Sequence, residues 1–208
     1  MEPSVDQALE WIRSGFIVVA PLEHGYVYLV DAFSHDGVRA MHALRGDTLG
    51  ITAQVLVGST DTLAGIARDI SSEVHAMMKA FWPGLLTLNL RPQRWLSWDL
   101  GDDKELDIVS VRVPSEDFVL ALLAKSGPLA CASVARAGAP PILTTVDLIS
   151  SKNELVRVCD FGELTAGPLT SVVSVNETET TLLREGAITL EELSAYVPGI
   201  SRLNSANS

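Results

Sequence analysis

The chain has 208 residues, of which 47% are hydrophobic and 20% charged, and its formal net charge is −11. This length and composition fit one domain with a sizeable core and exclude a disordered chain. The longest apolar run, residues 16–22, is far shorter than the roughly 20 residues that a membrane helix needs, so no membrane partner is expected. The strong negative charge argues against a broad nucleic-acid surface, which needs a basic face, and no DNA partner is expected.

The first ten residues contain three acids and no lysine or arginine, so we predict no secretory signal and a cytoplasmic location. Cys131 and Cys159 form no CxxC motif, which indicates neither a disulfide framework nor a zinc site. Cys131 lies in an apolar run and is interpreted as a small core residue.

Helix starts and strands alternate along the chain. Helices are expected to begin after five capping residues, namely Ser4, Ser34, Ser71, Ser115 and Thr189. Strands are expected at residues 16–20, 55–57, 86–90, 108–113, 129–133, 155–159, 172–175 and 181–183. Because some strands follow each other directly, this pattern predicts an α/β fold with a mixed sheet rather than a strict strand–helix–strand repeat.

Several familiar site motifs are absent. The sequence contains no P-loop, no dinucleotide fingerprint and no nucleophile elbow. The spacing of the four histidines matches no ligand set, so no metal is expected, and His35, His42 and His75 are interpreted as solvent-facing helix residues. The acidic cluster Asp99, Asp102, Asp103, Glu105 and Asp107 lacks the ligand order of a calcium loop and is interpreted as a solvated surface loop.

Three segments in order resemble the YrdC-like family, whose known members include L-threonylcarbamoyladenylate synthases. Residues 81–88, FWPGLLTL, resemble the family's F-W-P-G-P-L-T-L. Residues 109–114, VSVRVP, resemble V-G-V-R-x-P, and residues 183–188, LREGAI, resemble L-R-x-G-A-I. The resemblance extends over about residues 6–190 and implies a single YrdC-like domain for residues 1–208, in the short form, with a tail at 196–208.

The resemblance implies a fold, an activity and partners. The fold is a twisted mixed sheet flanked by helices around a central cleft. The activity is a nucleotidyltransferase-type synthesis of threonylcarbamoyl-AMP and pyrophosphate from L-threonine, bicarbonate and ATP with Mg, which supplies tRNA N6-threonylcarbamoyladenosine modification. The implied partners are the small-molecule substrates and, beyond them, proteins of the tRNA pathway or RNA, including double-stranded RNA.

The motif that faces the ligand near residue 21 is altered. The family's P-T-[DE]-T-x-Y-G-L aligns with residues 21–28, in which Glu23 and Tyr26 remain. Leu22 and His24 replace the two threonines, which removes hydroxyl groups and adds bulk. A change of this kind predicts a remodelled cleft.

The phosphate-binding positions are altered as well. The family's K-x-R and a further lysine align with Arg45, Asp47 and Ile51, whose formal charges sum to zero. A charge-assisted hydrogen bond contributes roughly 1.5–3 kcal/mol, so two lost bonds correspond to about a thousandfold weaker ATP binding or more.

Two later motifs keep only part of their pattern. The family's T-S-A-N aligns with residues 132–135, of which Ser133 survives, and S-T-V-V-D aligns with residues 170–174, which keep Ser171 but lose the acid. Arg112 is interpreted either as a carboxylate anchor or as the end of a strand, with Arg184 treated alike, and Tyr26 either as packing or as a ligand contact. The cleft candidates are therefore Glu23, Tyr26, Arg45, Arg112, Ser133, Ser171 and Arg184, with no catalytic residue assigned.

Three hypotheses follow. The first is a diverged member with weak or lost ATP and threonine chemistry and a remodelled ligand-binding cleft. The second is an active synthase in which Arg45, Arg112 and Arg184 hold phosphate and carboxylate groups. The third is an RNA- or nucleotide-binding module without catalysis, which the net charge of −11 weakens.

Overall fold

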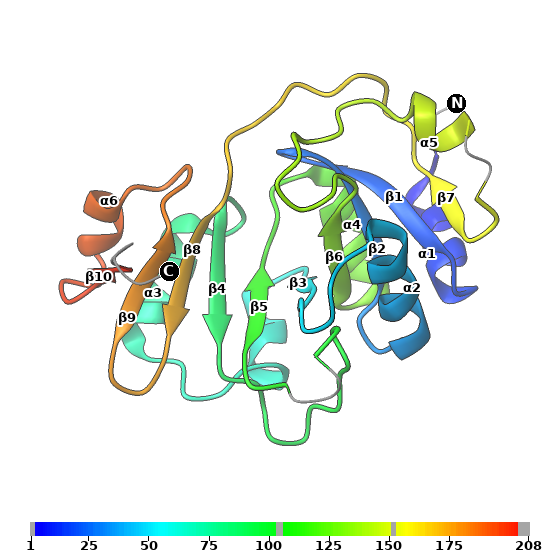
Figure 1. The fold of residues 1–208 in the computed structure, drawn as a ribbon. Coiled ribbons are helices and arrows are strands. Elements are labelled where there is room, and N and C mark those ends of the chain that lie inside the picture. Colours follow the sequence, from blue (N-terminus) through cyan, green and yellow to red (C-terminus); the bar gives the residue numbers. More distant parts are fainter. Residues whose placement is uncertain (1–2, 103–105, 151–152, 204–208) are drawn as a thin grey trace.

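A mixed sheet of ten strands runs through the computed structural model, which describes residues 3–102, 106–150 and 153–203. The strand order is β10-β9-β8-β4-β5-β3-β6-β2-β1-β7. The strands are β1 (Ile17–Leu22), β2 (Gly25–Asp31), β3 (Gln54–Leu56), β4 (Leu86–Leu90), β5 (Val109–Arg112), β6 (Leu129–Ser133), β7 (Val156–Val158), β8 (Ser171–Val175), β9 (Thr180–Arg184) and β10 (Ser201–Arg202). Within the described residues, six α-helices and one 3₁₀ helix flank this sheet, so the predicted α/β fold with a twisted mixed sheet is confirmed (Figure 1).

The helices are α1 (Val5–Arg13), α2 (His35–Arg45), α3 (Ser72–Phe81), α4 (Asp117–Ser126), α5 (Val146–Ser150) and α6 (Leu190–Ser194), and the 3₁₀ helix is η1 (Thr60–Gly65). No helix in the described part of the chain has the length and apolar character needed to cross a membrane.

Side chains that alternate along the strands form two hydrophobic cores. One core contains Val19, Val55 and Leu88 and packs against α2 and α3. The other contains Val18 and Leu129 and packs against α1 and α4. Because successive side chains of a strand point to opposite faces, the continuous apolar strands of the sequence supply both cores at once.

Most of the predicted helix caps are confirmed. The side chains of Ser4, Ser34 and Ser71 each accept a hydrogen bond from a backbone N–H of the first helical turn, and Thr189 with Glu192 forms a complete capping box. The prediction that Ser115 caps a helix is wrong.

The residue that precedes α4 is Glu116, so Ser115 does not cap this helix. The backbone N–H and the hydroxyl of Ser115 both donate to Oε1 of Glu23, at 2.7 and 2.8 Å. These bonds engage Ser115 with the β1–β2 turn, so its hydroxyl does not serve the helix.

The β1–β2 hairpin was not predicted, because residues 21–28 were interpreted as a ligand motif. Leu22 pairs with Gly25, so Glu23 and His24 alone form a two-residue turn between the strands. The strand β2 is therefore a second difference from the sequence-based expectation, which contains no strand at these residues. A tight turn of this kind fixes the two tip residues, and both of them contact the functional site.

The acidic cluster at residues 99–107 is only partly a solvated loop. The side chain of Asp99 is 1% exposed and accepts hydrogen bonds from Arg39 and from the backbone N–H of Gly101. Asp107 is exposed as expected, whereas residues 103–105 lie outside the described part of the chain. A buried carboxylate needs such partners, and the partner Arg39 comes from α2, which a local sequence pattern does not reveal.

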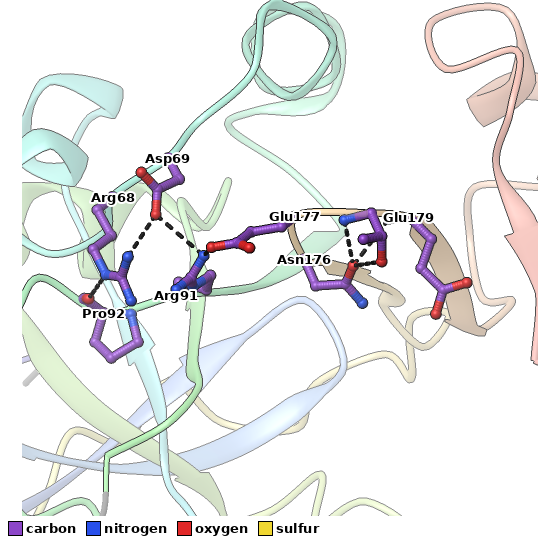
Figure 2. Close-up of polar contacts among 8 residues, drawn as sticks. Arg68, Asp69, Arg91, Pro92, Asn176, Glu177 and Glu179 are labelled. Atoms are coloured by element: carbon purple, nitrogen blue, oxygen red, sulfur yellow. Dashed lines mark hydrogen bonds and ion pairs between the residues drawn. The ribbon is translucent and has the colours of Figure 1, made fainter.

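A polar network closes the end of β4 that lies away from Arg112. Figure 2 shows Asp69 between Arg68 and Arg91, and Arg91 also forms an ion pair with Glu177 in the β8–β9 turn. Asn176 accepts three hydrogen bonds within that turn, from the backbone and hydroxyl of Thr178 and from the next backbone N–H. These contacts hold the η1–α3 connection and the turn together.

Candidate functional site

A cavity of about 320 Å³ lies where β1, β2, β3, β5, β6 and β9 meet the end of α2. Its walls combine apolar side chains with three arginines that come from distant parts of the sequence. The lining residues are Leu22, His24, Val27, His42, Arg45, Asp47, Ile51, Thr52, Ala53, Gln54, Arg112, Cys131, Ala132, Ser133, Leu169, Thr170 and Arg184. A concave, partly apolar site with a few convergent polar groups is typical of small-molecule binding.

Asp47 neutralises Arg45 inside this cavity. Nε of Arg45 donates to both carboxylate oxygens of Asp47, at 3.1 and 2.8 Å, and Nη1 donates to the backbone oxygen of Ser133 at 2.6 Å. The side chains of Asp47 and Arg45 are 3% and 11% exposed. The carboxylate therefore occupies the place against Arg45 that a ligand anion would otherwise take.

His42 completes this cluster and corrects the prediction that it faces solvent. Its side chain is 13% exposed, and Nδ1 lies 2.8 Å from Oδ2 of Asp47. Nε2 lies 3.0 Å from the backbone oxygen of Leu100. Both ring nitrogens of His42 therefore face an oxygen atom, and the ring lies between Asp47 and the loop at Leu100. By contrast His75 is exposed as predicted, and His35 is half-buried against Ser97.

Arg112 and Glu23 form a second buried ion pair. The side chain of Arg112 is 4% exposed and that of Glu23 is 15% exposed. Nη2 of Arg112 contacts Oε2 of Glu23, while Nε donates to the backbone oxygen of Gly84 at 2.8 Å. Burial alone would raise the pKa of Glu23, but the charge of Arg112 and the hydrogen bonds from Arg112 and Ser115 together hold it below its ordinary value.

Arg184 is held by the segment at residues 160–170, here called the strap. The strap joins β7 to β8 and crosses the end of the sheet, coloured yellow to orange in Figure 1. Nε and Nη2 of Arg184 donate to the backbone oxygen and the hydroxyl of Thr170, at 3.0 and 2.7 Å. Thr170 and Leu169 line the cavity, so the strap builds one of its walls.

The strap also lies directly on the β1–β2 turn. A side chain at Gly167 would overlap the backbone oxygen of Glu23, so only glycine fits this crossing. Nδ1 of His24 lies 2.7 Å from the backbone oxygen of Gly167. The hydroxyl of Tyr26 donates to Gly162 and accepts from the backbone N–H of Phe161, both at 2.9 Å.

The seven candidate residues fall into two groups. Arg45, Arg112, Ser133 and Arg184 line the cavity, with Glu23 behind Arg112 as its ion-pair partner. Tyr26 and Ser171 are buried outside the lining; Tyr26 holds the strap and Ser171 holds residues 186–188 by hydrogen bonds. The ligand roles of all seven residues stay predictions.

Sequence reasoning missed His24, His42 and Gln54 as parts of the cavity wall. His24 was counted only as a lost threonine, and His42 was placed on a solvent face. Gln54 sits at the start of β3, where its amide donates to Thr87 at 2.9 Å. The one available signal was Gly25 after Glu23 and His24, which indicates a tight turn whose tip residues project from the strands.

No group of three or more histidine, cysteine, aspartate or glutamate residues with metal-binding geometry occurs within residues 3–102, 106–150 and 153–203. Cys131, predicted to be a core residue, is 5% exposed and also lines the cavity.

We predict that Cys131 and Cys159 are inert in the folded protein. Burial raises the pKa of each thiol to about 12, so only about one part in ten thousand is ionised at pH 8. Ellman's reagent at pH 8 should give no absorbance change with the native protein, and it should detect two thiols after denaturation. Rapid reaction of one thiol before unfolding would contradict the closed packing at Cys131.

The comparisons with known proteins agree with one another. The family model Sua5/YciO/YrdC, described as "Telomere recombination", matches residues 10–186. A Mycobacterium leprae protein named "Putative threonylcarbamoyl-AMP synthase" is 29% identical over 197 residues, which cover 94% of this chain and 88% of that protein. A Mycobacterium tuberculosis protein with the same name is 30% identical over 190 residues, which cover 91% of this chain and 86% of that protein.

Solved structures show the same fold. Pyrococcus abyssi Sua5 complexed with L-threonine superposes with a TM-score of 0.84 at 26% identity and 96% coverage of this chain. The chain spans 58% of that longer protein. Escherichia coli YciO superposes with a TM-score of 0.75 at 20% identity, covering 91% of this chain and 92% of YciO, which supports the fold alone.

Proposed function

The chain belongs to the Sua5/YciO/YrdC family, and from that premise we propose that it is a diverged member whose cleft binds a small anionic ligand and has weak or lost ATP chemistry. The observation on which this rests is the ion pair of Asp47 with Arg45 inside the cavity. An ATP phosphate would have to displace a carboxylate that already accepts from both Arg45 and His42.

The three arginines favour a small anion over a long polyphosphate. Protein groups hold two nitrogens of each guanidinium in place. In the described part of the chain no partner is found for Nη2 of Arg45 or for Nη1 of Arg112 and Arg184. Each arginine thus offers one terminal nitrogen, and preorganised donors of this kind bind an anion without a further ordering cost.

The retained scaffold supports a second candidate, an active threonylcarbamoyl-AMP synthase. The two mycobacterial relatives named for this activity match more than nine-tenths of the chain. Catalysis by positioning and charge neutralisation tolerates some change in the surrounding residues.

Pyrophosphate release from Mg-ATP with L-threonine and bicarbonate separates the two candidates. The control is a family member that retains the K-x-R motif and the downstream lysine. We expect less than about one-hundredth of the control rate, because two lost phosphate contacts correspond to about 4 kcal/mol. A rate within about tenfold of the control would establish the synthase instead.

Anion binding by the cavity is tested separately by calorimetry with inorganic pyrophosphate and small dicarboxylates. Arg184→Gln should weaken binding about tenfold, because it removes one charge-assisted hydrogen bond. Arg157→Gln is the matched control. Arg157 belongs to β7, lies over the ring of Phe16 and does not line the cavity. Equal loss in both variants would show a general charge effect and overturn binding at this site.

A further inference from the structure

The two tip residues of the β1–β2 turn have different partners. Glu23 pairs with Arg112 and Ser115, and His24 contacts Gly167 of the strap. The turn has only two residues between paired positions, so the backbone allows little reorientation of either side chain. The imidazole of His24 is therefore held in a defined place on the cavity wall.

The contact with Gly167 fixes the tautomer of His24. A backbone oxygen has no proton to give, so Nδ1 of His24, which lies 2.7 Å from it, must be the donor. In the neutral ring the proton then resides on Nδ1, and Nε2 has a free lone pair. A histidine oriented in this way by a backbone carbonyl is suited to accept a proton or a hydrogen bond at Nε2.

Nε2 of His24 has no hydrogen-bond partner among residues 3–102, 106–150 and 153–203. His42, the other histidine of the lining, has both nitrogens engaged. The carboxylates of Asp47 and Glu23 are likewise occupied by arginines and other donors. Beside three arginines that only donate, His24 thus contributes a free ring nitrogen that accepts.

We propose that His24 is the specificity-determining acceptor of the cavity, and that it selects an anionic ligand with an O–H or N–H donor next to the anionic group. The arginines bind the anion, and Nε2 of His24 accepts from the adjacent donor. This proposal rests on the proposed anion-binding function for its ligand class. The tautomer and the free nitrogen are independent of that function.

The tautomer is measured by long-range ¹H–¹⁵N correlation spectra of the histidine side chains in the full chain. We expect neutral His24 to have its proton on Nδ1 and an unprotonated Nε2. His24→Asn identifies its signals by their loss. A proton on Nε2 in the neutral ring would overturn the proposal whatever the ligand is.

Ligand selection is measured by calorimetry with L-malate and succinate, which differ by one hydroxyl group. The wild-type protein should bind L-malate about fivefold to tenfold more tightly than succinate, the effect of one added hydrogen bond. His24→Asn retains an N–H that can donate to Gly167 but removes the acceptor at Nε2. It should lose the preference for L-malate, so that L-malate and succinate bind with nearly equal affinity.

His24→Gln is the complementary variant, because its amide reaches the position of Nε2 and leaves Gly167 without a donor. We expect it to weaken both diacids, since the strap is released. A preference for L-malate that persists unchanged in His24→Asn would reduce His24 to a latch for the strap and overturn the proposal. If neither the diacids nor inorganic pyrophosphate bind the wild type, the anion-binding function fails, and the tautomer measurement decides the proposal for His24.

Discussion

Asp47→Asn should bind inorganic pyrophosphate about tenfold to a hundredfold more tightly than the wild-type protein. The substitution keeps the size of the side chain but removes the charge that now neutralises Arg45. Each charge-assisted hydrogen bond restored to a ligand anion contributes roughly 1.5–3 kcal/mol. Calorimetry at low ionic strength measures the gain, because salt screens these interactions.

The same substitution should lower the free energy of unfolding by about 3 kcal/mol, the low end for a broken buried pair, because Arg45 and His42 keep 11% and 13% exposure. Asp99→Asn is the matched control. Asp99 is a 1% exposed carboxylate that pairs with Arg39 and does not line the cavity. It should lose stability without any change in pyrophosphate affinity. An unchanged affinity in Asp47→Asn would contradict the role assigned to this carboxylate.

Arg112→Met should have the largest effect on stability, a loss of about 3–5 kcal/mol in the free energy of unfolding. It leaves the carboxylate of Glu23 buried, with hydrogen bonds from Ser115 but without a counter-charge. The double variant Glu23→Gln/Arg112→Met should recover part of this loss, because neither charge is then buried. Urea unfolding of the single and double variants measures both effects. A single variant as stable as the wild type would show that the pair contributes nothing.

The pH dependence of stability follows from the lowered pKa of Glu23. A group whose pKa is lower in the folded protein stabilises it above the ordinary value, here 4.5, and loses this contribution as the pH falls through the folded value. The free energy of unfolding should therefore fall below about pH 4.5, and it should fall less steeply in Glu23→Gln. An equal slope in both proteins between pH 3 and pH 6 would assign the acid sensitivity to other carboxylates.

Local sequence patterns predicted most of the helices and strands because their causes are local. Ser34 and Ser71 mark helix starts by side-chain caps, and the apolar strands 86–90 and 129–133 have no solvent-facing alternation to obscure them. The prediction of Ser115 as a cap was wrong because its hydroxyl serves Glu23, a residue 92 positions away in sequence. Short elements such as η1, α5 and β10 depend on packing, and no periodic pattern in the sequence predicts them.

The cavity was predictable only in part, for the same reason. Family resemblance pointed to Arg45, Arg112 and Arg184 as cleft residues, and the structure places all three around one cavity. In the sequence, Asp47 is recognisable only as the acid whose formal charge cancels that of Arg45. Its contacts with Arg45 and His42 depend on how the chain after α2 turns back, which the spacing of residues does not specify.

The strand order has a consequence for how the protein reaches its folded state. The short strand β3 lies between β5 and β6, so its hydrogen bonds form only after more than 50 further residues of the chain are available. Pairings so distant in sequence slow folding, because a long loop must close before any contact rewards it. The residues of the cavity wall extend from 22 to 184 in the sequence, so a ligand can bind there only when nearly the whole chain is folded. A ligand of this cavity should consequently protect nearly the entire chain from proteolysis by mass action.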